Sequence, residues 1–225
     1  MSLARALGLV GVALGLGSAA LGGLACAQAG IGPRPVVAEQ PFHVPTGSLG
    51  RIAVVPFYPT PELGRGMPQG SPLGAADAAD LVATFATDAL RAQGFAVVPP
   101  SDLLGAFVSQ GRPIPRLDQR EAGALAAREF GATAVLLGKV YRYREREGQA
   151  LGATRPASVG FEVTLFDAPG GRRLWTSRFD ETQQPITANV FNAQRYPGGG
   201  RRWLTAAELA RWGADGTAKA LAAYK

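Results

Sequence analysis

The clearest pattern after residue 50 is an apolar run, a helical segment and a second apolar run. The runs "RIAVVPF" (51–57) and "FAVVPP" (95–100) predict short strands that are buried on both faces. Between them, residues 77–94 carry apolar side chains at helical spacing, with Arg91 in the last turn and Gly94 as the C-terminal stop. The order strand, helix, strand predicts a parallel crossover unit.

Three further helices are marked by their N-terminal residues. A short helix is expected in "SDLLGAF", with Ser101 or Asp102 as its cap, and a second over residues 118–130 with an acidic variant of the capping box. The last helix opens at Thr205, which forms a capping box with Glu208. Each of these helices has an apolar side that can cover a sheet.

The remaining strands have mixed patterns. Residues 132–146 are apolar in their first half and alternate in their second, where Tyr141 and Tyr143 are expected on one face and the arginines on the other. Alternation in 158–167 and 172–182, joined by the turn "APGG", predicts an antiparallel hairpin.

These elements predict an α/β fold, an α+β sandwich with a mixed sheet. It contains an early parallel β-α-β unit, a later antiparallel hairpin and a C-terminal helix. We expect a single α/β domain over residues 50–225. Residues 26–49 hold four prolines and are expected to be an extended tether.

Residues 1–25 have the layout of a bacterial signal peptide. Arg5 precedes a long apolar run without charge that ends in small residues. Two kinds of cleavage compete at its end. "GLAC" suggests cleavage before Cys26, with lipid attachment to that cysteine, whereas alanine patterns suggest cleavage after Ala27 or Ala29, which releases a soluble chain.

The cysteine count favours the lipid. Cys26 is the single cysteine of the 225 residues, so it has no disulfide partner in an oxidising compartment. Lipid attachment explains why the cysteine lies at the end of the signal segment. Gly23 departs from the usual lipoprotein pattern, which has leucine three places before the cysteine.

Composition argues against catalysis and against nucleic acid. The single histidine, His43, lies in the tether, which argues against a histidine metal site or a Ser-His-Asp triad. Carboxylates are numerous but are expected as caps, turn residues or exposed strand residues such as Glu162. The 23 basic and 17 acidic residues give a net charge of +6 that is spread along the chain. We therefore expect no enzymatic activity, no cofactor and no metal.

The stretch "GGGRR" (198–202) is the nearest approach to a phosphate-binding loop. Its spacing fits no nucleotide fingerprint, and Glu208 in the following helix would repel an anion. A surface loop that contacts a partner is the better interpretation, because aromatic and arginine residues are common interface anchors. The candidate contact residues are Tyr196, Arg201, Arg202 and Trp203.

Several short motifs resemble a group of bacterial envelope proteins. The group includes the curli-secretion channel lipoprotein, the lipoprotein activators of penicillin-binding proteins and the amino-terminal domain of TolB. Its "IAV-x-PF" strand, "V-x-x-x-D" step and "GA-x-x-hydrophobic-x-x-G" opening match residues 52–57, 98–102 and 131–138. The resemblance spans about residues 50–225 and implies a fold more strongly than a function.

The resemblance implies a non-enzymatic lipoprotein on the periplasmic face of the outer membrane. Ala27 after the cysteine agrees with the sorting of such lipoproteins to that membrane. We expect a lipid-anchored adaptor or assembly factor that binds an envelope protein or a cell-wall polymer. The alternatives are an oligomeric export or secretion-channel component and a soluble periplasmic protein. The channel is disfavoured because the core needs strands 133–146 and 157–181.

Overall fold

The computed structural model describes residues 35, 37–42, 49–67, 71, 73–111, 118–185 and 195–225. These residues belong to the second of two compact units, 32–225, the first being 1–31. Cys26, His43 and the signal segment lie outside the described residues. The predictions made for them are therefore not tested by the structure.

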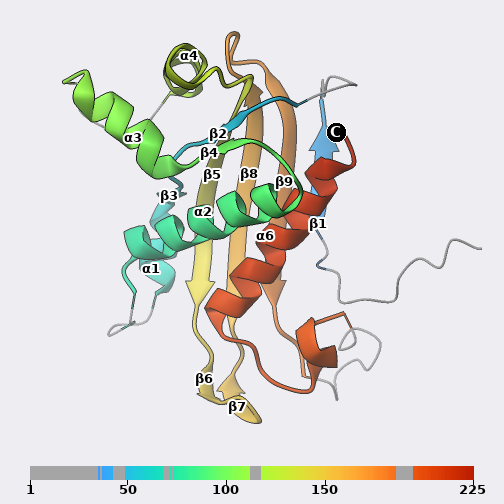
Figure 1. The fold of residues 1–225 in the computed structure, drawn as a ribbon. Helices are drawn as coiled ribbons and strands as arrows, with labels where there is room; N and C mark the ends of the chain where they lie inside the picture. Colours follow the sequence, from blue (N-terminus) through green and yellow to red (C-terminus); the bar gives the residue numbers. More distant parts are fainter. Residues whose placement is uncertain are drawn as a thin grey trace, which may run out of the picture. The chain divides into compact units, whose positions relative to one another are not determined.

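A mixed sheet forms the centre of the fold (Figure 1). Its strand order is β1-β9-β8-β5-β2-β4, and β3 also pairs with β5. β2 is parallel to β4 and β5, whereas the neighbouring pairs β5–β8, β8–β9 and β9–β1 are antiparallel. The strands are β1 (Val37–Pro41), β2 (Ile52–Val54), β3 (Tyr58–Pro59), β4 (Val97–Val98), β5 (Ala134–Arg144), β8 (Ser158–Asp167) and β9 (Arg173–Thr182).

The helices cover the sheet on both faces. Side chains of α1, α2 and α6 pack in the larger hydrophobic cluster, and those of α3 and α4 pack in a smaller one. β2 separates the two, since Ile52 and Val54 belong to the larger cluster and Ala53 to the smaller. The helices are α1 (Pro61–Gly66), α2 (Ala75–Ala92), α3 (Pro100–Ser109), α4 (Gln119–Phe130), α6 (Ala206–Ala222) and the 3₁₀ helix η1 (Pro197–Gly200).

The predicted fold class is confirmed. β2, α2 and β4 form the parallel crossover, and Gly94 adopts the left-handed φ of 77° just after α2. β8 and β9 form the antiparallel hairpin, with Phe161, Trp175 and Phe179 fully buried on one face. The early parallel unit, the later hairpin and the C-terminal helix therefore all appear where the periodicity placed them.

The helix caps agree with the prediction in two cases and differ in one. Asp118 caps α4 by accepting a hydrogen bond from the Arg120 N–H at 3.2 Å. Thr205 and Glu208 form both hydrogen bonds of the α6 capping box. The expectation of a cap at Ser101 or Asp102 is wrong. α3 begins at Pro100, because a proline at the first position costs no helical hydrogen bond.

A bulge in β5 corrects the expected placement of the two tyrosines. The pairing with β8 shifts between Val140 and Arg142, so strict alternation ends there. Tyr143 consequently lies in the larger core cluster, whereas the ring of Tyr141 lies on the opposite face against Gly160. Tyr141 and Tyr143 therefore do not share a face.

Several elements were not predicted, among them β1, β3 and α1. Residues 37–41 were assigned to the tether, but they form the edge strand β1, which pairs with β9. Pro41 is tolerated here because a residue of an edge strand does not need to donate a backbone hydrogen bond on its unpaired side. The stretch between β2 and α2, for which no element was predicted, contains β3 and α1, where Leu63 is buried.

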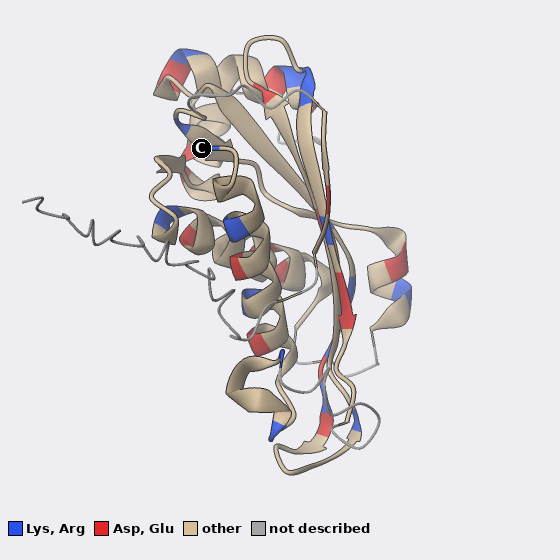
Figure 2. Ribbon diagram, turned by 90° about the vertical axis from the view of Figure 1, so that its right-hand side faces the viewer, with Lys and Arg blue, Asp and Glu red and all other residues tan. Residues whose placement is uncertain are grey.

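The face of β5, β8 and β9 opposite the larger cluster carries charged pairs. Lys139 lies 2.7 Å from Glu162, and Arg178 lies 2.7 Å from Asp180. Glu162 therefore faces away from the core, as its place in the alternation predicts. Figure 2 views the sheet nearly edge-on and shows both signs of charge along its strands.

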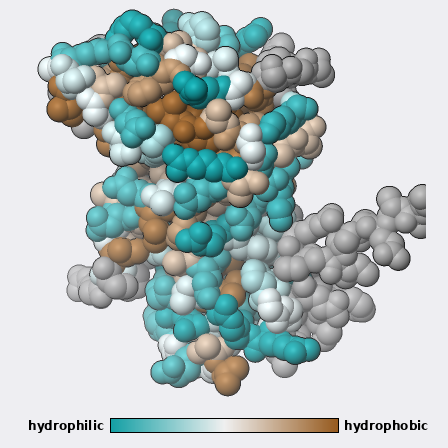
Figure 3. All heavy atoms as spheres, in the orientation of Figure 1, coloured by the Kyte–Doolittle hydropathy of each residue, from teal (hydrophilic) through white to brown (hydrophobic). Residues whose placement is uncertain are grey.

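A small hairpin extends beyond one end of the sheet. It consists of β6 (Glu147–Gln149) and β7 (Gly152–Arg155), which form a two-stranded sheet between β5 and β8. Leu151 in its turn is 87% exposed. Figure 3 shows hydrophobic atoms at the lower tip of the molecule, where Figure 1 places this hairpin. Among the described helices, none is long and apolar enough to span a bilayer.

Candidate functional site

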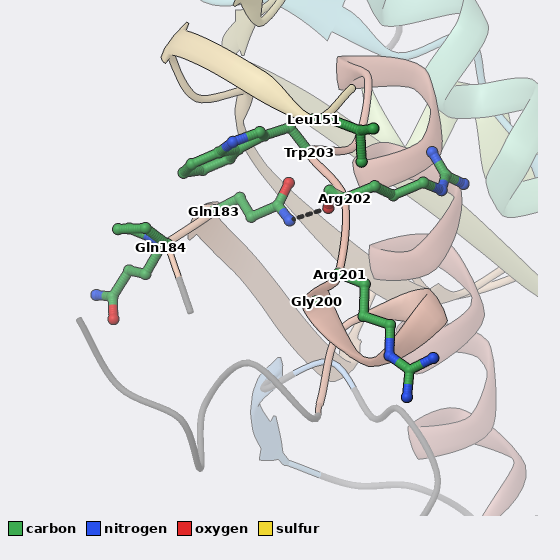
Figure 4. A pocket seen from close by; sticks show the side chains of 8 residues that line it. Leu151, Gln183, Gln184, Gly200, Arg201, Arg202 and Trp203 are labelled. Carbon is green, nitrogen blue, oxygen red and sulfur yellow. Dashed lines mark hydrogen bonds between the residues drawn. The ribbon is translucent and has the colours of Figure 1, made fainter. Parts of the chain in front are cut away.

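A pocket of about 190 Å³ lies beside the β6–β7 hairpin (Figure 4). Pockets that enclose small molecules usually measure about 300–1,000 Å³, so this one suits contact with a surface better than enclosure of a ligand. Its lining comes from the hairpin turn, the end of β9 and the segment before α6. The residues are Leu151, Gln183, Gln184, Pro185, Gly200, Arg201, Arg202 and Trp203.

The buried side chain of Gln183 fixes the backbone of this site. Its Nε2 donates to the Arg202 carbonyl at 2.9 Å, and its Oε1 accepts from the Leu204 N–H at 2.7 Å. Both ends of the amide are therefore used on either side of residue 203. Because Gln183 is buried, these hydrogen bonds are shielded from competing water.

Trp203 lies at the centre of the fixed segment. Its N–H donates to the Ala150 carbonyl at 2.8 Å, and its own carbonyl accepts a hydrogen bond from Arg146. The hairpin and the segment before α6 are thus joined through the Trp203 main chain. Its side chain is only half-buried, and Figure 4 shows the indole extending on the same side as Gln183.

Of the predicted contact residues, Tyr196 is in the core. Its ring is fully buried and lies 5.3 Å from Trp212, and its hydroxyl donates to Glu181 at 2.6 Å. Burial and the Glu181 carboxylate raise the pKa of Tyr196 to about 12. Arg195 pairs with the same carboxylate at 2.8 Å. Tyr196 therefore stabilises the fold here, and the expectation that it contacts a partner is corrected.

The two arginines of "GGGRR" have different environments. Arg202 forms two hydrogen bonds with the Glu208 carboxylate, at 2.8 and 2.7 Å, and these lower the pKa of Glu208 to about 2. Arg201 is exposed, and within the part of the chain that the structure describes its guanidinium has no ion pair. Figure 4 shows the Arg201 side chain extending away from the indole.

The N-terminus of α6 is already occupied by protein groups. Thr205 and Glu208 satisfy each other's N–H groups at 2.9 and 3.1 Å. The Ala206 N–H donates to both carboxylate oxygens of Glu145, at 3.2 and 3.1 Å. These two carboxylates leave no place for an anion, which argues against a phosphate site at "GGGRR".

The pocket lining determines what chemistry the site can perform. Its residues supply aliphatic, amide, guanidinium and indole groups, and none of the eight carries a carboxylate, imidazole, thiol or hydroxyl. General acid–base and nucleophilic catalysis need such groups. Across the described ranges, no cluster of His, Cys, Asp and Glu is arranged to hold a metal ion. The eight described lining residues therefore supply groups suited to binding and none of the groups usual in these two kinds of catalysis.

Leu151 and Gln183 are among the site residues that sequence reasoning missed. Leu151 is the one large aliphatic residue in the otherwise polar or small stretch "EREGQALGATR", which is a detectable signal of an exposed apolar turn. Gln183 has no comparable signal, because its role depends on meeting residues 202–204 from another part of the chain.

Comparison with solved structures finds only remote likeness. The PelC dodecamer from Paraburkholderia phytofirmans is 20% identical, with a TM-score of 0.39, over 68% of this chain and 88% of that chain. Lipoprotein GNA1162 from Neisseria meningitidis is 22% identical, with a TM-score of 0.39, over 60% and 84%. The LpoB C-terminal domain from Escherichia coli is 19% identical, with a TM-score of 0.39, over 60% and 84%.

The sequence matches no protein-family model and no curated protein. Structural likeness at this identity and TM-score assigns neither a family nor a function. The resemblance of the motifs to envelope lipoproteins therefore stays a prediction, and the function has to be argued from the residues themselves.

Proposed function

We propose that the protein is a lipid-anchored, non-catalytic adaptor of the bacterial envelope. Cys26 carries the lipid, and the mature chain lies on the periplasmic face of the outer membrane, where it holds an envelope protein or a cell-wall polymer. The signal-like layout of residues 1–25 and the single cysteine at its end support the anchor. Several acyl chains on one cysteine make such an anchor stable, because each buried CH₂ contributes about 0.8 kcal/mol.

The observation that carries the adaptor role is the rigid presentation of Trp203. Its backbone is held by Ala150, Arg146 and Gln183, while its half-buried indole lines the pocket. Interfaces draw much of their affinity from tryptophan and arginine held in place before binding. We propose Arg201, Arg202 and Trp203 as the surface that contacts an envelope component, with Arg202 acting mainly through its pairing with Glu208.

The anchor is tested by replacing its attachment site. Cys26→Ser is expected to move the protein from the membrane fraction to the soluble periplasmic fraction, because the lipid provides the stable attachment. Gly30→Ser is the matched control, since it changes a nearby residue and keeps the cysteine. A Cys26→Ser protein that stays wholly in the membrane fraction would refute the lipid anchor.

The contact surface is tested by photo-crosslinking in living cells. A photoreactive amino acid at position 203 is expected to give a covalent adduct with an envelope component. Position 108 is the control, because Val108 is 61% exposed but lies on α3, at the other end of the molecule from the hairpin (Figure 1). Equal yields at 203 and 108 would contradict a dedicated contact surface at Trp203.

A further inference from the structure

The chain enters the sheet from the end that carries the hairpin. Val37 of β1 pairs with Phe179, and Pro41 pairs with Trp175. β9 ends at Thr182, which pairs with Ser158 next to the hairpin. β1 therefore begins toward the Thr182 end of the sheet, the end at which Trp203 contacts the hairpin.

The length of chain before β1 allows the anchor to reach the hairpin tip. Ten residues separate Cys26 from Val37 in the sequence, and they span at most about 40 Å when extended. Val37 is three residues from the level of Thr182, or about 10 Å. The chain from Arg144 to Leu151 adds about 23 Å at most. The tether can thus place Cys26 level with the tip.

The tip presents side chains that favour a membrane–water interface. Leu151 is 87% exposed in the hairpin turn, and the half-buried indole of Trp203 lines the pocket beside it. Tryptophan favours the headgroup level of a bilayer, where its ring is amphipathic. An aliphatic side chain next to it can enter the acyl boundary.

The charge of this end complements an anionic lipid surface. Residues 144–157, 181–185 and 195–208 contain six arginines and four glutamates, which gives a net charge of +2. Three arginines are neutralised by glutamates, in the pairs Arg155–Glu147, Arg195–Glu181 and Arg202–Glu208. The fourth glutamate, Glu145, accepts from the Ala206 N–H, and Arg201 keeps an exposed positive charge.

We infer that the hairpin end rests on the bilayer that carries the anchor, with Leu151 and Trp203 at the headgroup level and Arg201 against anionic headgroups. This inference rests on the proposed lipid anchor and names the membrane surface as the component that the Trp203 site contacts. Lipid on Cys26 and contact by the hairpin thus fix the domain at two points rather than one.

The test uses the lipidated full chain in vesicles of phosphatidylcholine with about 30% phosphatidylglycerol. Because Cys26 is the single cysteine and its sulfur carries the lipid, Leu151→Cys provides one thiol for an environment-sensitive fluorophore. Val108→Cys is the matched control, as an exposed aliphatic residue at the other end of the molecule. Lipids with a quencher in the acyl chain are expected to lower the emission of the probe at 151 at least twofold and to leave the probe at 108 unchanged.

A second measurement tests the electrostatic contribution of Arg201 to membrane binding, in a chain without the lipid anchor. The Cys26→Ser chain is expected to bind the same vesicles weakly, and Arg201→Ala in that background is expected to lower its partition coefficient about fivefold. Vesicles of phosphatidylcholine alone should bind less of the Cys26→Ser chain than the anionic vesicles. Equal binding to both vesicles would contradict the role given to Arg201.

The outcomes separate this inference from the proposed function. Lipid on Cys26 together with equal quenching at 151 and 108 would overturn the membrane contact and leave the adaptor role standing. Absence of lipid on Cys26 would overturn the anchor first. A protein adduct at position 203 in the crosslinking experiment would show that a protein occupies this surface and would also overturn the membrane contact.

Discussion

At the scale of single residues, Gly160 shows how the sheet accommodates an aromatic ring on its charged face. The Tyr141 ring lies directly over Gly160, and the Arg178 guanidinium lies 4.7 Å from the centroid of that ring. The Tyr141 hydroxyl donates to the Phe179 carbonyl at 3.1 Å. Glycine is needed here for the close approach of the ring, which a Cβ would block.

Gly160→Ala is therefore expected to destabilise the protein by about 1–3 kcal/mol, the usual cost of overpacking. The free energy of unfolding, measured in urea, tests this value. Gly152→Ala is the control, because a Cβ at Gly152 meets nothing within 4 Å. Equal stabilities of the two variants would show that the Tyr141 ring does not require Gly160.

Glu208 gives a prediction about pH. Its pKa is about 2, below the ordinary 4.5, mainly because Arg202 donates hydrogen bonds to its carboxylate. The stability that the ionised Glu208 contributes is fully present above pH 4.5 and is lost as the pH falls toward 2. Glu208→Gln, which keeps a capping side chain, should remove this part of the pH dependence. Unfolding curves at pH 5 and pH 3 that change equally in both proteins would contradict this account.

At the scale of elements, local signals were read correctly from the sequence and long-range contacts were not. The capping box of α6 and the alternation in β8 and β9 depend on residues close together in the sequence. The sequence pattern was therefore sufficient to predict these elements. The bulge in β5 depends on the pairing of Arg142 with Gly160, which no local pattern reports. Tyr196 was misjudged for the same reason, since its burial comes from packing against α6.

The strand β1 was missed because its stability is also non-local. Its residues are mostly exposed and include Pro41, so the sequence pattern indicated a tether rather than a strand. Glu39 accepts a hydrogen bond from the Trp175 indole at 3.2 Å, and Phe42 lies 4.6 Å from the Arg173 guanidinium. These contacts with β9 hold the strand at the sheet edge. Part of the segment that was predicted to be a tether is therefore a strand of the sheet.

Gly216→Ala should loosen the chain around β1. Pro35 lies so close to Gly216 of α6 that a Cβ would collide with it. Hydrogen exchange of the β1 amides is expected to become about tenfold faster, which corresponds to about 1.4 kcal/mol of local stability, while β5 exchange stays the same. Gly64→Ala is the control, because a Cβ there meets nothing within 4 Å. Unchanged exchange in β1 would show that Pro35 does not support the strand.

At the scale of the whole molecule, one end of the sheet brings together the features that bear on function. The β6–β7 hairpin, the Trp203 surface and the entry of β1 all lie at the Thr182 end. The sequence alone suggested contact through "GGGRR" but could not show that the hairpin supports it. That knowledge required the Trp203–Ala150 and Gln183–Leu204 hydrogen bonds.

The central claim is that the chain is held to the membrane by lipid on Cys26. Intact-mass spectrometry of the protein purified from its native host tests it most directly. The account predicts a mature chain that begins at Cys26 and carries the added mass of a diacylglyceryl group and an amide-linked acyl chain. A mature chain that begins at Gln28 or Gly30, without lipid, would contradict it.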